Sequence, residues 1–476
     1  MIFTSYTYLL FLVVAVLLHW SLPQRFRNAL LIVLSYGFYC SWRWQYGFLL
    51  LAVSIFTWLF GALLSRRENN RRLLALGIIV ELGPLVYYKY SGFIVANLEG
   101  LAASLGYAPH LHLPDVILPL GISFFTFQGI AYLVDVANGE HPIDRMDHFL
   151  LYKAFWPQLI AGPIIRPHEI RDQIAAVRHV DYADVAEATK RILYGFFKKG
   201  VLADTLAPYV DAVFQPTARP GAIDGAIGII GFSMQIYFDF AGYSDIAIGS
   251  ARLIGFRFPE NFDYPYVARS PQDFWNRWHM TLTRWIRDYV FTPLAFASRR
   301  QPKIALLWLV LAMALCGLWH GGRWTFVLWG IWHGVLLLAN QTFLRGLWSG
   351  FDKPAKRGRF ARAMAWLLTM LGVALGWVLF RSQTVAQAAS IVTGIVTLRG
   401  GLRPTVLREN GVLLVVAFAL GLGLEQVLKG PAVRIMGRLR GHESVGSAIR
   451  ALGYAALVLA VTVFESDVKA FVYFQF

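Results

Sequence analysis

The chain has 476 residues, of which 57% are hydrophobic and only 15% are charged, and its mean hydropathy is +0.51. This composition excludes a soluble enzyme, because apolar segments long enough to cross ~30 Å of hydrocarbon recur along the whole sequence. The net charge of +16 comes from 44 Lys and Arg against 28 Asp and Glu, but the basic residues lie in short loops between apolar segments, as membrane orientation requires. We therefore expect the lipid bilayer as a partner and no nucleic acid.

The apolar segments predict one all-α polytopic membrane domain that covers residues 1–476. Several segments are broken or too short for a simple crossing, so we expect about 10–12 transmembrane helices plus re-entrant and interfacial helices. Cys40 and Cys316 both lie in apolar segments, so no disulfide framework is expected. The predicted spans, in chain order, are 5–20, 28–46, 48–64, 73–91, 116–136, 148–165, 190–213, 224–255, 304–320, 324–345, 361–381, 411–428 and 449–465.

Short basic segments predict how these spans are oriented. Cytoplasmic loops carry an excess of Lys and Arg, so the N-terminus is expected outside. The helix that ends at His320 and the helix that follows it then form a hairpin entered and left from the cytoplasm, and the span 449–465 carries the C-terminus outward. The basic segments are Arg25–Arg27, 65–72, Arg299–Lys303, 353–362 and 429–440.

Proline and glycine interrupt two of the apolar segments. Residues 117–136 include Pro119 and Gly121, and either a kinked spanning helix or the wall of a cavity fits this pattern. Residues 156–168 hold three prolines and cannot form one straight helix, so we expect a re-entrant turn there.

Two carboxylates, Asp239 and Asp245, lie within an apolar and aromatic run in the sequence Y-F-D-F-A-G-Y-S-D. An ionised side chain is costly in hydrocarbon and normally faces a partner or a polar interior. Two interpretations remain open: a structural pairing, for example with Arg252 or Arg257, or a position lining a substrate path.

A clear helix start follows at Ser270, which fits an N-cap, with Pro271 at the first helical position and Asp273 in the first turn. The apolar spacing beyond it predicts one amphipathic helix lying in the membrane interface, with His279 at the edge of its buried face. The apolar face comprises Trp275, Trp278, Leu282, Trp285, Ile286 and Tyr289, and the arginines away from it are Arg277, Arg284 and Arg287.

A second histidine, His320, ends an apolar helix and is followed by Gly321–Gly322. A helix that breaks beside a titratable group inside a membrane is what a reactive site needs. His333, in a second W-H-G triplet, is interpreted as a core residue. No metal is expected, because the spacing of His279, His320 and His333 matches no zinc pattern.

Two chemistries remain on residue grounds alone. A proton-coupled transporter would use intramembrane His and Asp as relays, although no internal repeat of the transporter kind is visible. General-base catalysis by an imidazole is the other, because His titrates near neutral pH and can take the proton of a hydroxyl that attacks an acyl donor.

Three motifs favour the enzyme. R-W-H-M-T-L-T-R-W-I-R-D-Y, G-L-W-H-G and Y-F-D-F-A-G-Y-S-D-I-A-I-G resemble the membrane-bound O-acyltransferase superfamily, in the branch of alginate O-acetyltransferases and of the membrane protein of teichoic acid D-alanylation. The resemblance continues through L-P-L-G-I-S-F, L-I-A-G-P-I-I-R and N-F-D-Y-P-Y, so it covers most of the chain, with its core motifs at about 116–345.

The resemblance implies a fold, a site and a reaction. The family fold is a ring of helices around a central funnel with a tunnel between the two membrane faces. His320 is then the principal catalytic residue and His279 the second one, and the side chains expected to line the tunnel are Asp239, Asp245, Trp278 and Trp319. No permanently bound cofactor is expected.

The implied reaction is O-acetylation of an exported polysaccharide, such as alginate or cellulose, with acetyl-CoA as the donor. The expected location is a bacterial inner membrane with a periplasmic N-terminus, and the expected partners are a periplasmic SGNH-hydrolase-like acetyltransferase and the polysaccharide synthesis machinery. Acylation of a lipid or protein by a different acyl chain, and a transporter of acylated compounds, are the alternatives.

The last six residues, F-V-Y-F-Q-F (471–476), resemble an aromatic C-terminal motif of such systems. The resemblance implies that Tyr473 carries the acetyl group outward. An aromatic anchor at the membrane interface is an equally open interpretation.

Overall fold

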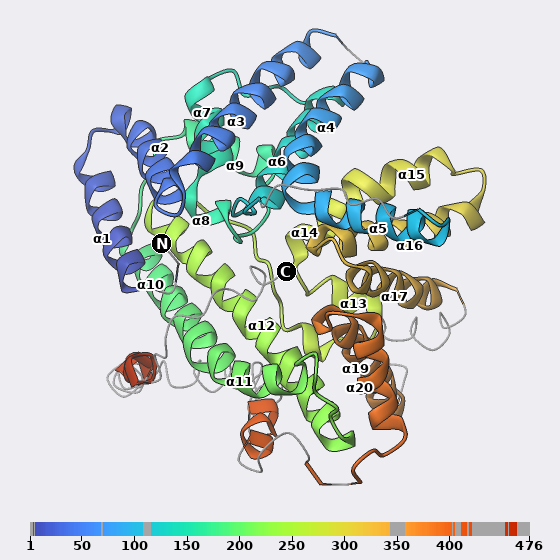
Figure 1. Cartoon of the computed structure of the whole chain (residues 1–476). Helices are drawn as coiled ribbons and strands as arrows, with labels where there is room; N and C mark the ends of the chain where they lie inside the picture. Colours follow the sequence, from blue (N-terminus) through green and yellow to red (C-terminus); the bar gives the residue numbers. More distant parts are fainter. Residues whose placement is uncertain are drawn as a thin grey trace. The chain divides into compact units, whose positions relative to one another are not determined.

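The computed structural model describes residues 3, 5–67, 70–107, 116–342, 358–401, 403–404, 411–416, 418–420, 453–455 and 457–463. Within these ranges the chain forms helices and connecting turns and contains no strand (Figure 1), which confirms the all-α prediction. The basic segment 429–440 and the tail with Tyr473 lie outside the described residues, as do parts of the predicted spans 411–428 and 449–465.

Four of the described helices are long and apolar enough to cross a membrane. An α-helix rises 1.5 Å per residue, so about 20 residues span the hydrocarbon core. Together with the shorter apolar helices, they confirm a polytopic membrane protein. The four are Trp44–Ser65, Arg71–Ser104, Lys303–His320 and Arg359–Arg381, and the shorter ones include Tyr6–Ser21, Ile122–Ala137 and Val385–Val396.

The chain divides into two compact units. The first comprises Met1–Ile192 with Tyr243–Glu260, and the second comprises Leu193–Gly242 with Asn261–Phe476. Helix α12 (Ala222–Leu253) contributes residues to both. The single domain expected from the sequence stays a prediction.

The first unit packs α3 against α4 and α6, and α2 against α7. Its centre holds a buried ion pair, in which Lys153 Nζ lies 3.2 Å from Glu81 Oε1 and 3.1 Å from Thr57 Oγ1. The elements are α1 (Tyr6–Ser21), α2 (Gln24–Cys40), α3 (Trp44–Ser65), α4 (Arg71–Leu85), the π-helical turn η1 (Val86–Tyr90), α5 (Ser91–Ser104), α6 (Ile122–Ala137), α7 (Met146–Ala154), α8 (Trp156–Leu159), α9 (Pro167–Ala175) and most of α10 (Tyr182–Phe196).

Two predicted spans of this unit are corrected. The span 148–165 is wrong, because α7 ends at Ala154 and only the short α8 follows before an irregular stretch, so residues 156–168 do not form one straight helix. The segment 116–136 is helical only from Ile122, because Gly121 adopts a left-handed conformation (φ 71°). A Cβ at Gly121 would also lie 2.3 Å from the carbonyl oxygen of Leu159, so only glycine fits this close approach.

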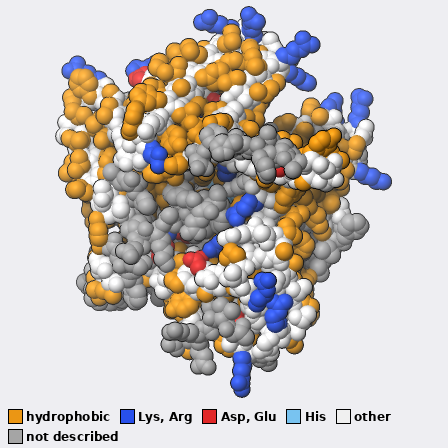
Figure 2. Space-filling view, in the orientation of Figure 1, with side chains coloured by type: hydrophobic (Ala, Val, Ile, Leu, Met, Phe, Trp, Pro, Cys, Tyr) orange, Lys and Arg blue, Asp and Glu red, His pale blue; other side chains and the backbone are white. Residues whose placement is uncertain are grey.

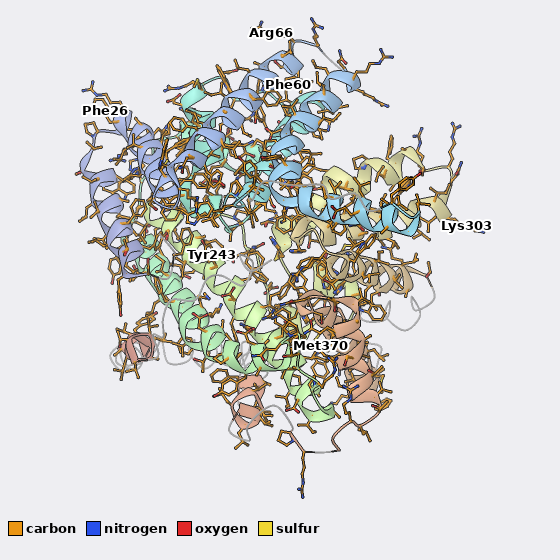
Figure 3. All side chains as sticks on the ribbon, viewed as in Figure 1. Phe26, Phe60, Arg66, Tyr243, Lys303 and Met370 are labelled. Carbon is orange, nitrogen blue, oxygen red and sulfur yellow. The ribbon has the colours of Figure 1, made fainter. Side chains whose placement is uncertain are left out.

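The surface of the first unit matches a membrane environment. Large apolar side chains are widely exposed, for example Leu10 at 67% and Ile79 at 65%, and Figure 2 shows apolar side chains covering much of the visible helix surfaces. Arg66 lies where α3 ends (Figure 3) and is exposed, as are Arg67, Arg71 and Arg72 of the predicted basic segment 65–72.

The second unit is organised around a helical hairpin, in which α16 and α17 lie side by side (Figure 1) and α17 also packs against α13 and α19. Lys303, at the start of α16 (Figure 3), is exposed. The elements are the end of α10, the π-helical η2 (Phe197–Ala203), α11 (Asp204–Val213), part of α12, η3 (Pro265–Val267), α13 (Pro271–Trp275), α14 (Met280–Ile286), η4 (Arg287–Phe291), α15 (Thr292–Ala297), α16 (Pro302–His320), α17 (Trp324–Gln341), α19 (Arg359–Arg381) and α20 (Val385–Val396).

Helix α20 was not predicted from the sequence. Its 12 residues are too few for a crossing, and polar residues interrupt its apolar positions. The side chain of Thr384 caps it by accepting a hydrogen bond from the backbone N–H of Gln387 (3.1 Å).

Small residues bring α16 and α17 into close contact. A Cβ at Gly317 would lie 2.1 Å from the carbonyl oxygen of Phe326, and one at Gly330 would lie 2.1 Å from that of Met313. Gly334 lies four residues beyond Gly330, and a Cβ there would lie 2.7 Å from the Cα of Val310. Membrane helices use such spacing to let their backbones approach, and here it fixes the helix that ends at His320.

Candidate active site

The segment that presents His279 begins where the sequence predicts. Ser270 Oγ accepts a hydrogen bond from the backbone N–H of Asp273 (3.1 Å), and Pro271 is the first residue of α13. The Asp273 carboxylate in turn accepts from Arg277 Nε (2.7 Å). The cap stabilises the start of this short helix, and the ion pair stabilises its end.

The prediction of one continuous helix beyond this start is wrong. Helix α13 ends at Trp275, a turn follows, and α14 begins only at Met280. Between them His279 adopts a left-handed backbone conformation with φ 41° and ψ 54°, which costs a residue with a Cβ roughly 1–2 kcal/mol. The apolar residues of the predicted face are nonetheless buried from Trp275 to Ile286, because two short helices satisfy the same spacing.

The imidazole of His279 is completely buried. Its Nδ1 lies 3.0 Å from Oδ1 of Asn261, and its ring lies edge-on to Phe240 with centroids 4.5 Å apart. Nε2 has no hydrogen-bond partner among the described residues. His279 lies outside the four spanning helices, and burial lowers the pKa of its imidazole, which favours the neutral ring.

The imidazole of His320 is held where α16 ends. The residue is 4% exposed, and rings from three helices surround it: Trp319 (centroids 4.8 Å apart), Trp329 (5.1 Å) and Phe380 (5.1 Å). Gly321 follows because a Cβ there would lie 2.6 Å from the ring of Phe326. The predicted helix end at His320 is therefore confirmed.

The indole ring of Trp319 lies beside the imidazole rings of both His279 and His320. Its ring centroid lies 4.8 Å from that of His320 and 6.0 Å from that of His279, so the two imidazoles are no farther apart than the sum of these distances. The structure thus brings together two residues that are far apart in sequence. Two imidazoles in an aromatic enclosure can move a proton where water is excluded.

Trp278 and His333 lie in the aromatic packing beside this pair. Trp278 stacks on Phe274 (centroids 5.6 Å apart, interplanar angle 13°) and packs against Trp377 (4.9 Å). His333 is 1% exposed and lies among the rings of Trp275, Trp329 and Phe274, as a core residue would. Among the described residues, no three His, Cys, Asp or Glu side chains gather to hold a metal ion.

Asp239 and Asp245 are both paired, but not with the partners that the sequence suggested. Lys199 Nζ lies 2.7 Å from Asp239 Oδ1 and 2.7 Å from Asp204 Oδ1, and Arg191 Nε lies 2.9 Å from Asp245 Oδ1. The suggested arginines, Arg252 and Arg257, instead pair with Asp184 (2.9 and 3.7 Å). Along one straight helix only residues three or four apart meet, and Arg252 is seven residues beyond Asp245. The role of the two aspartates in lining a tunnel stays a prediction.

Sequence reasoning missed Asn261, the residue that contacts His279. Its signal was weak: one amide in an irregular segment between two prolines, inside the motif N-F-D-Y-P-Y. Nothing in its local spacing points to a histidine 18 residues later.

Comparison with known proteins gives consistent matches. The family described as MBOAT, membrane-bound O-acyltransferase, matches residues 145–380, which include both histidines. A probable alginate O-acetylase of Azotobacter vinelandii is 39% identical over 394 residues, covering 82% of this chain and 76% of that protein. A peptidoglycan O-acetyltransferase of Helicobacter pylori is 32% identical over 402 residues (78% and 74% covered), and a teichoic acid D-alanyltransferase of Bacillus subtilis is 29% identical over 284 residues (57% and 71%).

Proposed function

Because this chain belongs to the membrane-bound O-acyltransferase family, and is therefore an acyltransferase of a membrane, we propose that it transfers acetyl groups for the O-acetylation of an exported polysaccharide. The donor is a thioester on the cytoplasmic side, acetyl-CoA, which is bound only as a substrate. The observation that carries the proposal is the buried pair His279 and His320, in a chain whose relatives are named for acetylating alginate and peptidoglycan.

The proposed chemistry is acyl transfer with a histidine as general base. The acceptor hydroxyl attacks the thioester carbonyl, a C–O bond forms and the C–S bond breaks. The imidazole of His320 takes the hydroxyl proton and returns it to the departing thiolate, which leaves as free coenzyme A. An imidazole suits this task because its unperturbed pKa of about 6.5 is near the working pH.

Tyr473 is proposed as a relay for the acetyl group. Its phenol, with an ordinary pKa of about 10, needs a base at neutral pH, and His320 is the residue to provide it. Replacing Tyr473 by Phe keeps the ring and removes the oxygen, so polymer acetylation should stop. Retained acetylation in that variant would leave the tail as an aromatic anchor.

The proposed setting is a bacterial inner membrane with the N-terminus in the periplasm. The exposed residues Arg66, Arg67, Arg71 and Arg72, where one apolar helix ends and the next begins, support this orientation. A periplasmic SGNH-hydrolase-like protein and the polysaccharide synthesis machinery are the partners that would receive the acetyl group.

The decisive experiment incubates the purified protein with radiolabelled acetyl-CoA and an acceptor polysaccharide, and measures the label that becomes covalently attached. His320→Ala should abolish transfer while the protein remains folded and inserted. His333→Phe is the matched control, because it replaces a second buried histidine of the same aromatic cluster and should leave transfer nearly unchanged. Wild-type activity in His320→Ala would refute the assignment.

The same assay separates the alternatives. A longer acyl-CoA used in preference to acetyl-CoA, with a lipid or protein as the labelled product, would indicate a different acyl transfer. An acylated compound that crosses a vesicle membrane unchanged, with no covalent transfer, would indicate a transporter.

A further inference from the structure

Asn261 contacts three consecutive residues at the break between α13 and α14. Its backbone carbonyl accepts a hydrogen bond from the N–H of Met280 (2.9 Å). Its side-chain oxygen Oδ1 accepts from the N–H of Thr281 (3.3 Å) and the hydroxyl of Thr281 (2.9 Å), and lies 3.0 Å from His279 Nδ1. The residue is 1% exposed, so these contacts are shielded from water.

These contacts identify the atom that faces His279. A backbone N–H can only donate, so the Asn261 atom beside the Thr281 N–H is the amide oxygen and not the nitrogen. An amide oxygen has no proton to give. The proton between it and His279 therefore belongs to the imidazole, which is protonated at Nδ1.

The other ring nitrogen is then fixed as well. A neutral imidazole carries one proton, so Nε2 of His279 keeps its lone pair. Nε2 is buried and has no partner among the described residues, and a buried polar atom without a partner is costly. A hydroxyl group that enters the site would satisfy it by donating a hydrogen bond.

We propose that Asn261 is a positioning residue that holds His279 as the Nδ1-protonated tautomer, so that Nε2 accepts a hydrogen bond from the acceptor hydroxyl. The proposal rests on the acyl transfer proposed above. It gives the two histidines successive tasks on the single hydroxyl proton: Nε2 of His279 accepts it in a hydrogen bond while the acceptor binds, and His320 takes it when the hydroxyl turns towards the thioester carbonyl. It also excludes a role for Nε2 as a donor to the oxyanion of the tetrahedral intermediate, because Nε2 carries no proton.

The same contacts hold the backbone that aims the ring. The left-handed conformation of His279 persists only when its surroundings impose it, and the Asn261 bonds to Met280 and Thr281 fix the two residues that follow. The ring of Phe240 lies edge-on to the imidazole, at an interplanar angle of 84°. The contacts with Asn261 and Phe240 thus fix the backbone conformation, the ring plane and the tautomer of His279.

The test compares three variants of the full-length protein. Asn261→Asp keeps an acceptor oxygen for Nδ1–H, whereas Asn261→Leu has a similar size and no acceptor. Thr281→Val is the matched control, because it removes one hydrogen bond to the same Oδ1 and leaves the contact between Asn261 and His279. The readouts are the imidazole nitrogen-15 chemical shifts of His279, assigned by their loss in His279→Gln, and the kcat and KM of acetyl transfer.

We expect the wild type and Asn261→Asp to show protonated Nδ1 and bare Nε2. Asn261→Leu should show the other tautomer or a mixture, and its kcat should fall at least tenfold, in the range usual for residues that orient a reactive imidazole. Thr281→Val should keep the tautomer and at least half of the kcat.

Three results would overturn the proposal: protonated Nε2 in the wild type, an unchanged tautomer and kcat in Asn261→Leu, or an equal loss in Thr281→Val, which would make Asn261 a structural anchor only. The wild-type spectrum decides the tautomer even if Asn261→Leu fails to fold. If the wild type transfers no acetyl group from any donor, the proposed function fails, while the spectrum still confirms or refutes the tautomer.

Discussion

Substitution of Gly330 by alanine should show how tightly the α16–α17 hairpin positions His320. An added Cβ would lie 2.1 Å from the carbonyl oxygen of Met313, although Cβ atoms essentially never approach other atoms within 3.0 Å. The two backbones must therefore separate by about 1 Å, because a packed interior cannot absorb the overlap. Trp329, next to Gly330 in sequence, contacts the ring of His320, so the shift reaches the site directly.

The expected effects follow from this displacement. A misplacement of about 1 Å at a reacting group can reduce the rate ~100-fold, so acetyl transfer by Gly330→Ala should fall by about that factor. Overpacking costs typically ~1–3 kcal/mol, so its melting temperature in detergent should also fall. Acetyl transfer and melting are measured on the same purified samples.

Gly37 in α2 provides the matched control. A Cβ at Gly37 meets no atom within 4 Å, and alanine is favoured over glycine in a helix by about 1 kcal/mol. Gly37→Ala should therefore keep full activity and melt at the same temperature or slightly higher. If Gly330→Ala behaved like Gly37→Ala in both measurements, close helix packing would not be what positions His320.

Three further predictions concern stability in detergent. Lys153→Met should lower the free energy of unfolding by ~3–5 kcal/mol, because it leaves Glu81 as a buried unpaired charge. The double variant with Glu81→Leu should recover most of this stability. If the two substitutions were instead additively destabilising, the reasoning would be contradicted. Lys199→Met should be more destabilising than Asp239→Asn, since the first leaves two carboxylates without their cation and the second keeps the pair of Lys199 with Asp204; equal melting temperatures would argue against a shared cation. Ser270→Ala should lower the free energy of unfolding by about 1 kcal/mol, and Ser270→Asp should lower it much less, because Asp can also cap the helix. Equal stability of the two variants would show that the cap does not stabilise the protein.

Much of the fold could be predicted from the sequence because its signals are local. Apolar length predicts the helices that cross a membrane, and a polar residue followed by proline predicts the start of α13 at Ser270. The glycines after His320 predict the end of α16. Each of these features depends on neighbours within a few residues, so no tertiary information is needed to see it.

The candidate site could be predicted only in part. Motif resemblance pointed to His279 and His320, but periodicity predicted one continuous helix through His279, where the structure has a break. Periodicity records which side chains are buried, and two short helices bury the same ones as a single long helix does. The partners predicted for Asp239 and Asp245 were wrong for a related reason: local spacing indicates only cations of the same segment, whereas the paired cations Arg191 and Lys199 lie outside the helix of the two aspartates.

The sequence by itself determined that this protein is a helical membrane acyltransferase and where its two candidate catalytic histidines lie along the chain, because hydropathy, caps and motifs are properties of short segments. Only the tertiary structure decided that Trp319 lies beside both imidazoles and that Asn261 contacts His279. The contacts of His279 with Asn261 and Trp319 join residues 18 and 40 positions apart, and they form only when the helices pack. The tautomer of His279, and with it the task we assign to that residue, belongs to this second kind of information.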